Sequence, residues 1–290
     1  MSGNNGRRRT TGSSAAKRQM RSSNGKLLRD TGRAVGGALI FSLPMLMTME
    51  MWWLGFYADP IRLAVLIALS VPLLIGLSHR IGFRYTLRWQ DIVLDAVFAL
   101  GIGLFTSVTV LILFNVNRSD MAVEEIVGKI ALQTIPAGIG ALLARSQFVA
   151  TSNEPDQRRE DTYGGEMFLM GVGALFLGFN IAPTEETVLI SYQMTQWHAI
   201  ALVLLSLAVM HGFVFALGFQ GGTELSPETP WWSALIRFTL PGYVVASGVS
   251  LFILWVFGRT DGLAFEQVVM AMIVLAFPSA VGAAAARLIL

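Results

Sequence analysis

Two Thr-x-Glu motifs are the residues of this sequence best suited to chemistry, because each places a carboxylate within a long apolar stretch. Thr48 and Glu50 form the first motif, and Thr184 and Glu186 form the second. A carboxylate at the centre of a membrane span costs about 2.5–3.5 kcal/mol on insertion scales, so a retained pair is a functional candidate. We expect these four residues to bind an ion. The structural alternative is that each glutamate lies at the water interface, where the penalty is smaller.

Two more glutamates open apolar stretches that are predicted to begin at the same side of the membrane. These are Glu124 and Glu266. Together with Glu50 and Glu186 they would form an acidic mouth that concentrates cations. The alternative is again structural, since a carboxylate at a helix N-terminus offsets the helix macrodipole by about 0.3–1 kcal/mol.

Other ionisable residues lie deeper in the predicted spans. His211, near the middle of a span, could relay protons, or it could be held by a hydroxyl or a carbonyl group. Glu125 and Lys129 stand four residues apart and should pair on one helix face. The matching positions in the second half of the chain are Gln267 and Ala271, so both charges are lost together, as expected of a salt bridge.

Long apolar segments must position these residues. Of the 290 residues, 54% are hydrophobic and 14% are charged, whereas a soluble protein has about 25% charged residues. A helix needs about 20 apolar residues to cross a bilayer, and continuous rather than alternating apolarity favours helices over a β-barrel. The sequence predicts an all-α integral membrane protein with eight transmembrane helices, near 34–57, 61–80, 91–115, 122–144, 166–190, 197–219, 233–257 and 265–287.

The placement of lysine and arginine predicts the orientation and the division of the chain. Residues 1–33 form a basic, polar tail that is predicted to be disordered and cytoplasmic, and residues 146–165 form a polar linker. The predicted halves are 34–145 and 166–290. Both termini are expected in the cytoplasm, and the tail could contact anionic lipid. The remaining cytoplasmic basic residues are Arg80, Arg84, Arg88, Arg145, Arg158, Arg159, Arg237 and Arg287.

An internal repeat relates the two halves. Residues 37–83 align with 173–219 without gaps and share 11 identities, where roughly 4 or 5 are expected by chance in so apolar a composition. A second block, offset by 142 residues, pairs Pro136 with Pro278 and Gly140 with Gly282. An even number of spans per half makes the repeats parallel. We therefore expect two four-helix repeats related by a pseudo-two-fold axis along the membrane normal.

Several function classes are excluded or disfavoured by what the sequence contains. It has no cysteine and three histidines, which disfavours a transition-metal site, and no cofactor is expected. Motifs of soluble hydrolases, nucleotide-binding proteins and metalloproteases are absent, so we expect no enzyme. Nucleic acid is not an expected partner, because the basic tail is already accounted for by membrane topology.

The pattern of spans and the stretch FNIAPTEET at 179–187 resemble an uncharacterised bacterial family of predicted integral membrane proteins, a domain of unknown function. The resemblance covers roughly residues 25–290. It implies residence in the inner membrane of a bacterium and carries no assigned activity.

The leading hypothesis from sequence is a transporter or channel for a small cation or for protons. The glutamates and threonines named above would bind or gather the ion, and His211 would relay a proton. The alternative is a non-transporting membrane scaffold or sensor that uses the tail and the linker as partner surfaces. That alternative predicts a tightly packed, dry interface between the halves. The sequence leaves the oligomeric state open.

Overall fold

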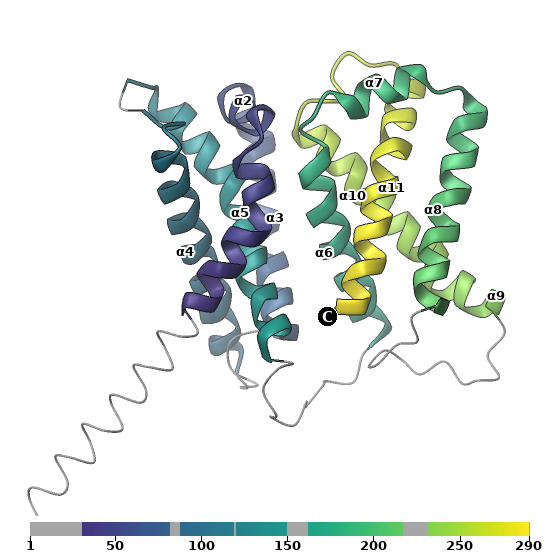
Figure 1. The fold of residues 1–290 in the computed structure, drawn as a ribbon, viewed down its shortest axis with the longest axis horizontal. Helices are drawn as coiled ribbons and strands as arrows, with labels where there is room; N and C mark the ends of the chain where they lie inside the picture. Colours follow the sequence, from purple (N-terminus) through teal and green to yellow (C-terminus); the bar gives the residue numbers. More distant parts are fainter. Residues whose placement is uncertain (1–30, 82–87, 119, 150–161, 217–230, 290) are drawn as a thin grey trace, which may run out of the picture.

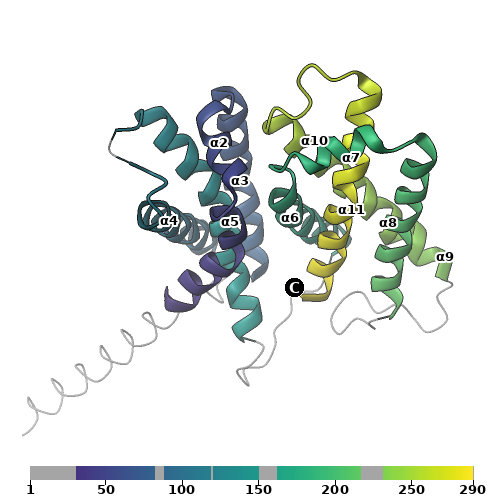
Figure 2. The same ribbon diagram turned by 45° about the horizontal axis from the view of Figure 1, so that its top comes forward.

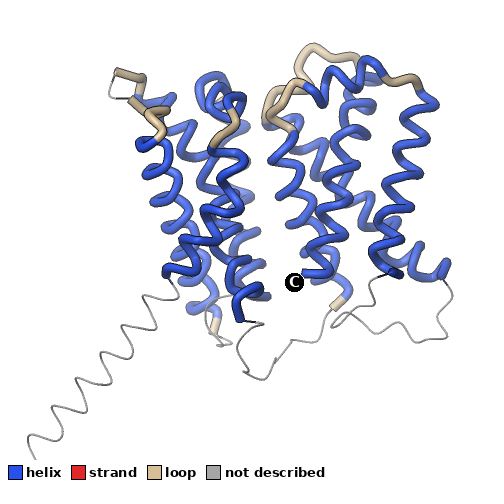
Figure 3. The backbone as a smooth tube through the Cα atoms, viewed as in Figure 1, coloured by secondary structure: helices blue, strands red, loops and turns tan. Residues whose placement is uncertain are grey.

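The fold is all helical over the residues described by the computed structural model, which are 31–81, 88–118, 120–149, 162–216 and 231–289 (Figures 1 and 3). No strand occurs in these ranges. The predicted tail therefore lies outside the described residues up to position 30, as does 150–161 of the predicted linker. The helices flanking the linker run further than expected, since α5 ends at Val149 and α6 begins at Tyr163.

The first half contains a helix at Thr31–Leu46, followed by four labelled helices. Within the described residues, the second half contains α6 and six further helical elements, one of them a five-residue π-helix. The bounds in the first half are α2 Met49–Tyr57, α3 Pro60–Ile81, α4 Trp89–Leu113 and α5 Val123–Val149. In the second half they are α6 Tyr163–Ile181, α7 Glu186–Gln193, α8 Gln196–Ala216, α9 Trp231–Ala234, the π-helix η1 Leu235–Thr239, α10 Leu240–Val256 and α11 Phe265–Ile289.

Seven helical segments within the described residues are long and apolar enough to cross a membrane. The first predicted span, 34–57, is broken: Thr31–Leu46 and α2 meet at an angle of 81°. Counting this bent pair as one span gives up to eight. The fifth predicted span, 166–190, also ends early, because α6 stops at Ile181 and α7 begins separately at Glu186.

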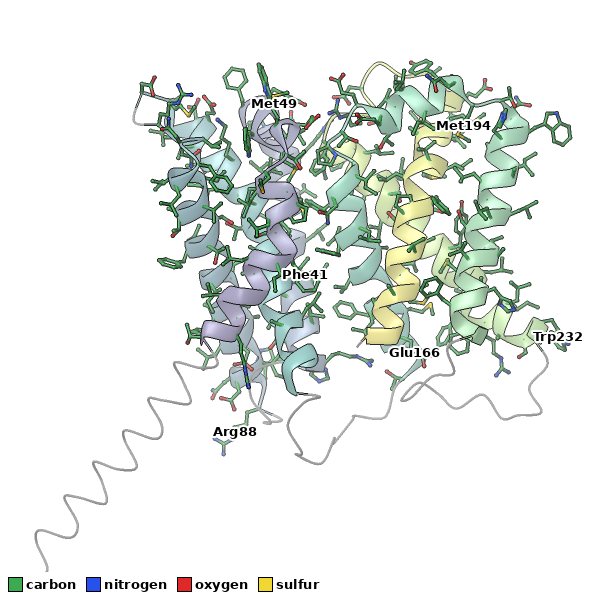
Figure 4. The ribbon with its side chains drawn as sticks, in the orientation of Figure 1. Phe41, Met49, Arg88, Glu166, Met194 and Trp232 are labelled. Carbon is green, nitrogen blue, oxygen red and sulfur yellow. The ribbon has the colours of Figure 1, made fainter. Side chains whose placement is uncertain are left out.

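The short helices α2 and α7 lie at one end of the molecule, which we call the α7 face (Figures 1 and 2). Met49 and Met194 mark this end in Figure 4, whereas Arg88 and Glu166 mark the opposite end, which we call the linker face. Membrane proteins carry an excess of lysine and arginine on the cytoplasmic side. Arg88 lies at the linker face, so this rule predicts that the α7 face is the non-cytoplasmic one.

Close glycine contacts hold the core of each half together. A Cβ added to Gly37 would overlap Ala144, and a Cβ added to Gly173 would overlap Ala286. Small residues let membrane helices approach closely, and van der Waals packing then holds them in place of a hydrophobic driving force. The helices α5 and α11 form the packed centres of their halves, because each contacts three or more neighbouring helices.

The contact surface between the halves, which we call the seam, is formed by α3 and the helix Thr31–Leu46 on one side and by α6 and α10 on the other. Leu66, Leu74 and Leu77 of α3 belong to the same buried apolar cluster as side chains of α6 and α10. The ring of Phe41 meets that of Phe176 edge-on at 4.9 Å. Apolar side chains therefore fill the middle of the seam.

The arrangement does not confirm the two-fold relation expected from sequence. A two-fold axis would bring α3 and its counterpart α8 to equivalent places beside the seam. Instead, α3 packs against α10 across the seam, whereas α8 lies on the far side of the second half (Figures 1 and 2). The physical reason is that Arg62 and Arg80 of α3 form hydrogen bonds to the second half. The α8 residues 136 positions later, His198 and Ala216, have no guanidinium group to form the same contacts.

Candidate functional site

The first Thr-x-Glu motif lies at the break between Thr31–Leu46 and α2. The Thr48 hydroxyl donates to the Pro44 carbonyl at 2.5 Å, and Glu50 falls in the first turn of α2. The Trp52 indole N–H donates to the Leu46 carbonyl at 2.8 Å, which satisfies a group that the interrupted helix leaves open. Glu50 is half-buried. The break therefore places its carboxylate at the α7 face rather than in the middle of a span.

The second motif also lies between two helices, and it has an arginine nearby. The Thr184 hydroxyl donates to the Ile181 carbonyl at 2.8 Å, and Glu186 is the first residue of α7. Arg259 reaches this turn from the loop after α10 and donates to the Pro183 carbonyl. Glu186 therefore has the positive charge of Arg259 nearby.

The carboxylate of Glu186 is held in its charged form. Its pKa lies below the ordinary value of 4.5, first because its own backbone N–H donates a hydrogen bond to it, then because of Thr184 and the positive charge of Arg259. At neutral pH this side chain is a carboxylate. Such a group suits the gathering of cations better than the relay of protons.

The other predicted acids also lie at the α7 face. Glu124 is exposed in the first turn of α5, and Glu266 is exposed in the first turn of α11. Gln196, at the start of α8, donates to Glu266 at 3.4 Å. Among the described residues, no three His, Asp or Glu side chains gather closely enough to hold a metal ion. The acids share one face of the molecule without forming one compact site.

His211 lies in the second half, against the π-helix η1. Its Nδ1 and the Thr239 hydroxyl are 3.1 Å apart, in a hydrogen bond whose direction depends on the imidazole tautomer. Thr239 is fully buried. Single turns of π-helix often occur at functional sites. The histidine is thus partnered by a hydroxyl, as one of the two interpretations of the sequence expects.

A row of buried polar side chains lies along α5, and the sequence analysis predicted only part of it. The predicted salt bridge is confirmed: Lys129 Nζ lies 2.5 Å from Glu125 Oε1, with the lysine almost fully buried. One turn further, Gln133 donates to the Met45 carbonyl at 3.1 Å, beside the helix break. Sequence reasoning missed Gln133. Its spacing of four residues from Lys129 was the available signal, because it places the two side chains on one helix face.

Two arginines at the ends of α3, Arg62 and Arg80, join the halves, a role that the sequence analysis did not predict for either. At the α7 face, Arg62 forms a two-pronged salt bridge with Asp261 at 2.8 and 2.9 Å and also donates to the Trp255 carbonyl. At the linker face, Arg80 donates to the Thr162 hydroxyl at 3.0 Å. We call these contacts the two latches. Their signal in sequence is that the α8 counterparts of both arginines are uncharged or weakly basic.

Comparison with known proteins places the chain in a family. The model of the family described as "Putative integral membrane protein (DUF2391)" matches residues 30–290. The chain belongs to this family. No curated protein and no solved structure matches the chain.

Membership agrees with the resemblance found in the sequence and covers both halves of the structure. The family description and the apolar helices together make the chain an integral membrane protein embedded in a lipid bilayer. The family description names no activity. A function must therefore be argued from the site itself.

Proposed function

We propose that this protein transports a small cation or protons across the membrane and that its two helix breaks provide the ion-binding groups. The observation that carries the proposal is the recurrence of a helix break at the same place in both halves, each followed by a glutamate at the start of a short helix. Interrupted helices commonly form the ion sites of secondary transporters. Enzymatic chemistry plays no part in the proposal.

Each residue has a role in this proposal. Thr48 and Glu50 in the first half, and Thr184 and Glu186 in the second, supply oxygen ligands. Glu124 and Glu266 raise the local cation concentration at the same face. His211, bonded to Thr239, is the group that would relay a proton.

The proposal includes a tandem duplication with eight spans, the bent pair being the first of them. The offset of 136 residues relates α3 to α8, since they begin at positions 60 and 196. The offset of 142 relates α5 to α11, which begin at 123 and 265. Backbone detail supports the relation. Asn115 and Gly258 both have positive φ, at 55° and 68°, directly after α4 and α10.

The proposed orientation puts both termini and the linker face in the cytoplasm of a bacterium, with the chain in the inner membrane. Arg88 lies at the linker face in Figure 4, in agreement with the rule for positive residues. The basic tail would contact anionic lipid at that surface.

Flux measurements on reconstituted protein test the transport proposal. Full-length protein in liposomes is assayed for potassium, sodium and proton flux with ion-selective dyes. We expect flux above empty liposomes, and we expect Glu50→Gln combined with Glu186→Gln to reduce it toward that background. Glu185→Gln is the matched control, because Glu185 is exposed, adjacent and not duplicated. Equal flux in the double variant and the control would reject the assigned ligands.

A second candidate function is a non-transporting scaffold or sensor, with the tail and the linker as partner surfaces. The apolar middle of the seam and its two latches favour it, because a scaffold requires the halves to stay together. This candidate expects no ion flux from the wild-type protein under any gradient. The same liposome assay therefore separates the two candidates.

A further inference from the structure

The salt bridge between Glu125 and Lys129 is a part of the polar row along α5 to which the proposed function gives no role. Among the described residues, Lys129 is the one buried basic residue, with its side chain 6% exposed against 18% for that of Glu125. It lies six residues inside α5, so its Cα is about 9 Å from the start of that helix at 1.5 Å per residue. Ionisable residues kept inside membrane spans commonly mark ion pathways.

Helix α2 covers this salt bridge. A Cβ added to Gly55 of α2 would overlap the backbone and the side chain of Lys129, and one added to Gly128 would overlap the Gly55 carbonyl. The two helices therefore approach closely beside the lysine, as small residues permit. Glu125 is more exposed than Lys129 and lies nearer the start of α5, so its carboxylate is the group that ions at the α7 face can reach.

The ammonium group of Lys129 makes one strong contact. Its Nζ lies 2.5 Å from Glu125 Oε1, and the Met121 sulfur, a weak acceptor, lies at 3.7 Å. One turn further along α5, Gln133 donates to the Met45 carbonyl, but its own Oε1 is buried with no hydrogen-bond partner among the described residues. Leaving a buried acceptor unpaired costs free energy, and a donor that reached Gln133 would remove that cost.

We propose that Glu125 and Lys129 form a site that exchanges one monovalent cation for one proton. The inference rests on the proposed transport function and names its exchange chemistry. The pair is neutral as a whole, and a net charge inside a low-dielectric surrounding is costly. The cation binds the Glu125 carboxylate in place of the ammonium group, and Lys129 releases a proton to water, which restores neutrality. The N–H bond breaks, its electron pair stays on nitrogen, and the neutral amine donates a hydrogen bond to Gln133 Oε1.

The charge balance decides which ions fit and how many protons leave. A monovalent cation replaces one proton and keeps the site neutral, whereas a divalent cation would leave an uncompensated positive charge. Under the proposed duplication, the second half has Gln267 and Ala271 at the matching positions, so the site occurs once per chain. Binding of the cation should therefore release about one proton per chain.

Proton release from the full-length protein in detergent tests the site without requiring transport. Sodium or potassium chloride is added in a weakly buffered solution with a pH-indicating dye, and choline chloride corrects for ionic strength. We expect wild type to release about one proton per chain. Lys129→Arg should release none, because a guanidinium group keeps its proton in proteins. Asp120→Asn, which removes an exposed acid before α5, should match wild type.

The outcomes separate the exchange site from the proposed function. Wild-type protein that releases no proton with either salt would overturn the site, as would equal release by Lys129→Arg. If Lys129→Arg does not fold, the variant with both Glu125→Gln and Lys129→Met removes the two charges together and should release none. Release equal to wild type by that double variant would also overturn the site. Proton release without ion flux in liposomes would keep the site and reject transport.

Discussion

At the scale of single residues, the two glutamates proposed as ion ligands have different surroundings. Glu186 is exposed and stands near Arg259, which also donates to the Pro183 carbonyl, whereas Glu50 is half-buried at the break before α2. An arginine competes with a cation for a carboxylate. Arg259 should therefore weaken cation binding at Glu186, and the two proposed sites should differ in affinity.

The lowered pKa of Glu186 makes the stability of the protein depend on pH. A carboxyl with a lower pKa in the folded state stabilises that state above the unfolded pKa, and this stability is lost as pH falls through the folded pKa. We expect Glu186→Gln to lower the unfolding temperature in detergent at pH 7, with the difference from wild type disappearing in acid below the folded pKa. Glu185→Gln controls for the loss of one surface charge. A difference that persists unchanged in acid would contradict the assignment.

At the scale of helices, the sequence offset of the proposed duplication changes within one pair of elements. Trp89 and Trp231 begin matching helices with an offset of 142, but Asn115 and Gly258 follow those helices with an offset of 143. The π-helix at Leu235–Thr239 accounts for the added residue. A sequence alignment without gaps therefore matches α4 poorly with α9, η1 and α10, although a residue with positive φ follows both.

Helix crossings at glycine should be sensitive to a single methyl group. Gly37→Ala would press a Cβ against Ala144, and we expect destabilisation by about 1–3 kcal/mol. Gly36→Ala, one residue earlier in the same helix, meets nothing and should stabilise by about 0.5–1 kcal/mol. Unfolding in mixed micelles measures both changes. Equal effects at the two positions would show that this crossing is looser than the structure indicates.

At the scale of the whole molecule, α3 connects the two halves at both faces of the membrane. Its ends carry the two latches, and its middle packs on apolar side chains of the second half. Such a seam can open at one face only if the latch there breaks. Transport by movement of the halves would therefore require the salt bridge at the α7 face to break and re-form.

The latch at the α7 face should contribute a measurable coupling energy. Arg62 also lies 5.3 Å from the centre of the Trp255 ring, but the Asp261 side chain is 58% exposed, so solvent screening weakens the pair. We expect a double-mutant cycle with Arg62→Gln and Asp261→Asn to give a coupling of about 0.5–1 kcal/mol. Unfolding in detergent supplies the four stabilities, with Arg118→Gln in place of Arg62→Gln as the control. Zero coupling would show that the Arg62–Asp261 salt bridge does not stabilise the seam.

The sequence by itself determined that the chain lies in lipid and that its two halves share repeated motifs. It also determined the residue ranges of most helices. These properties depend on local composition and spacing, which is why the Glu125–Lys129 salt bridge was also predictable. Tertiary structure alone decided which faces meet. Arg62 and Asp261 are 199 residues apart in the chain, and no periodicity relates them. The positions of Glu50 and Glu186 likewise depended on the helix breaks. Polar turns at Thr48 and Thr184 end the helices there, whereas hydropathy alone predicts that both spans continue.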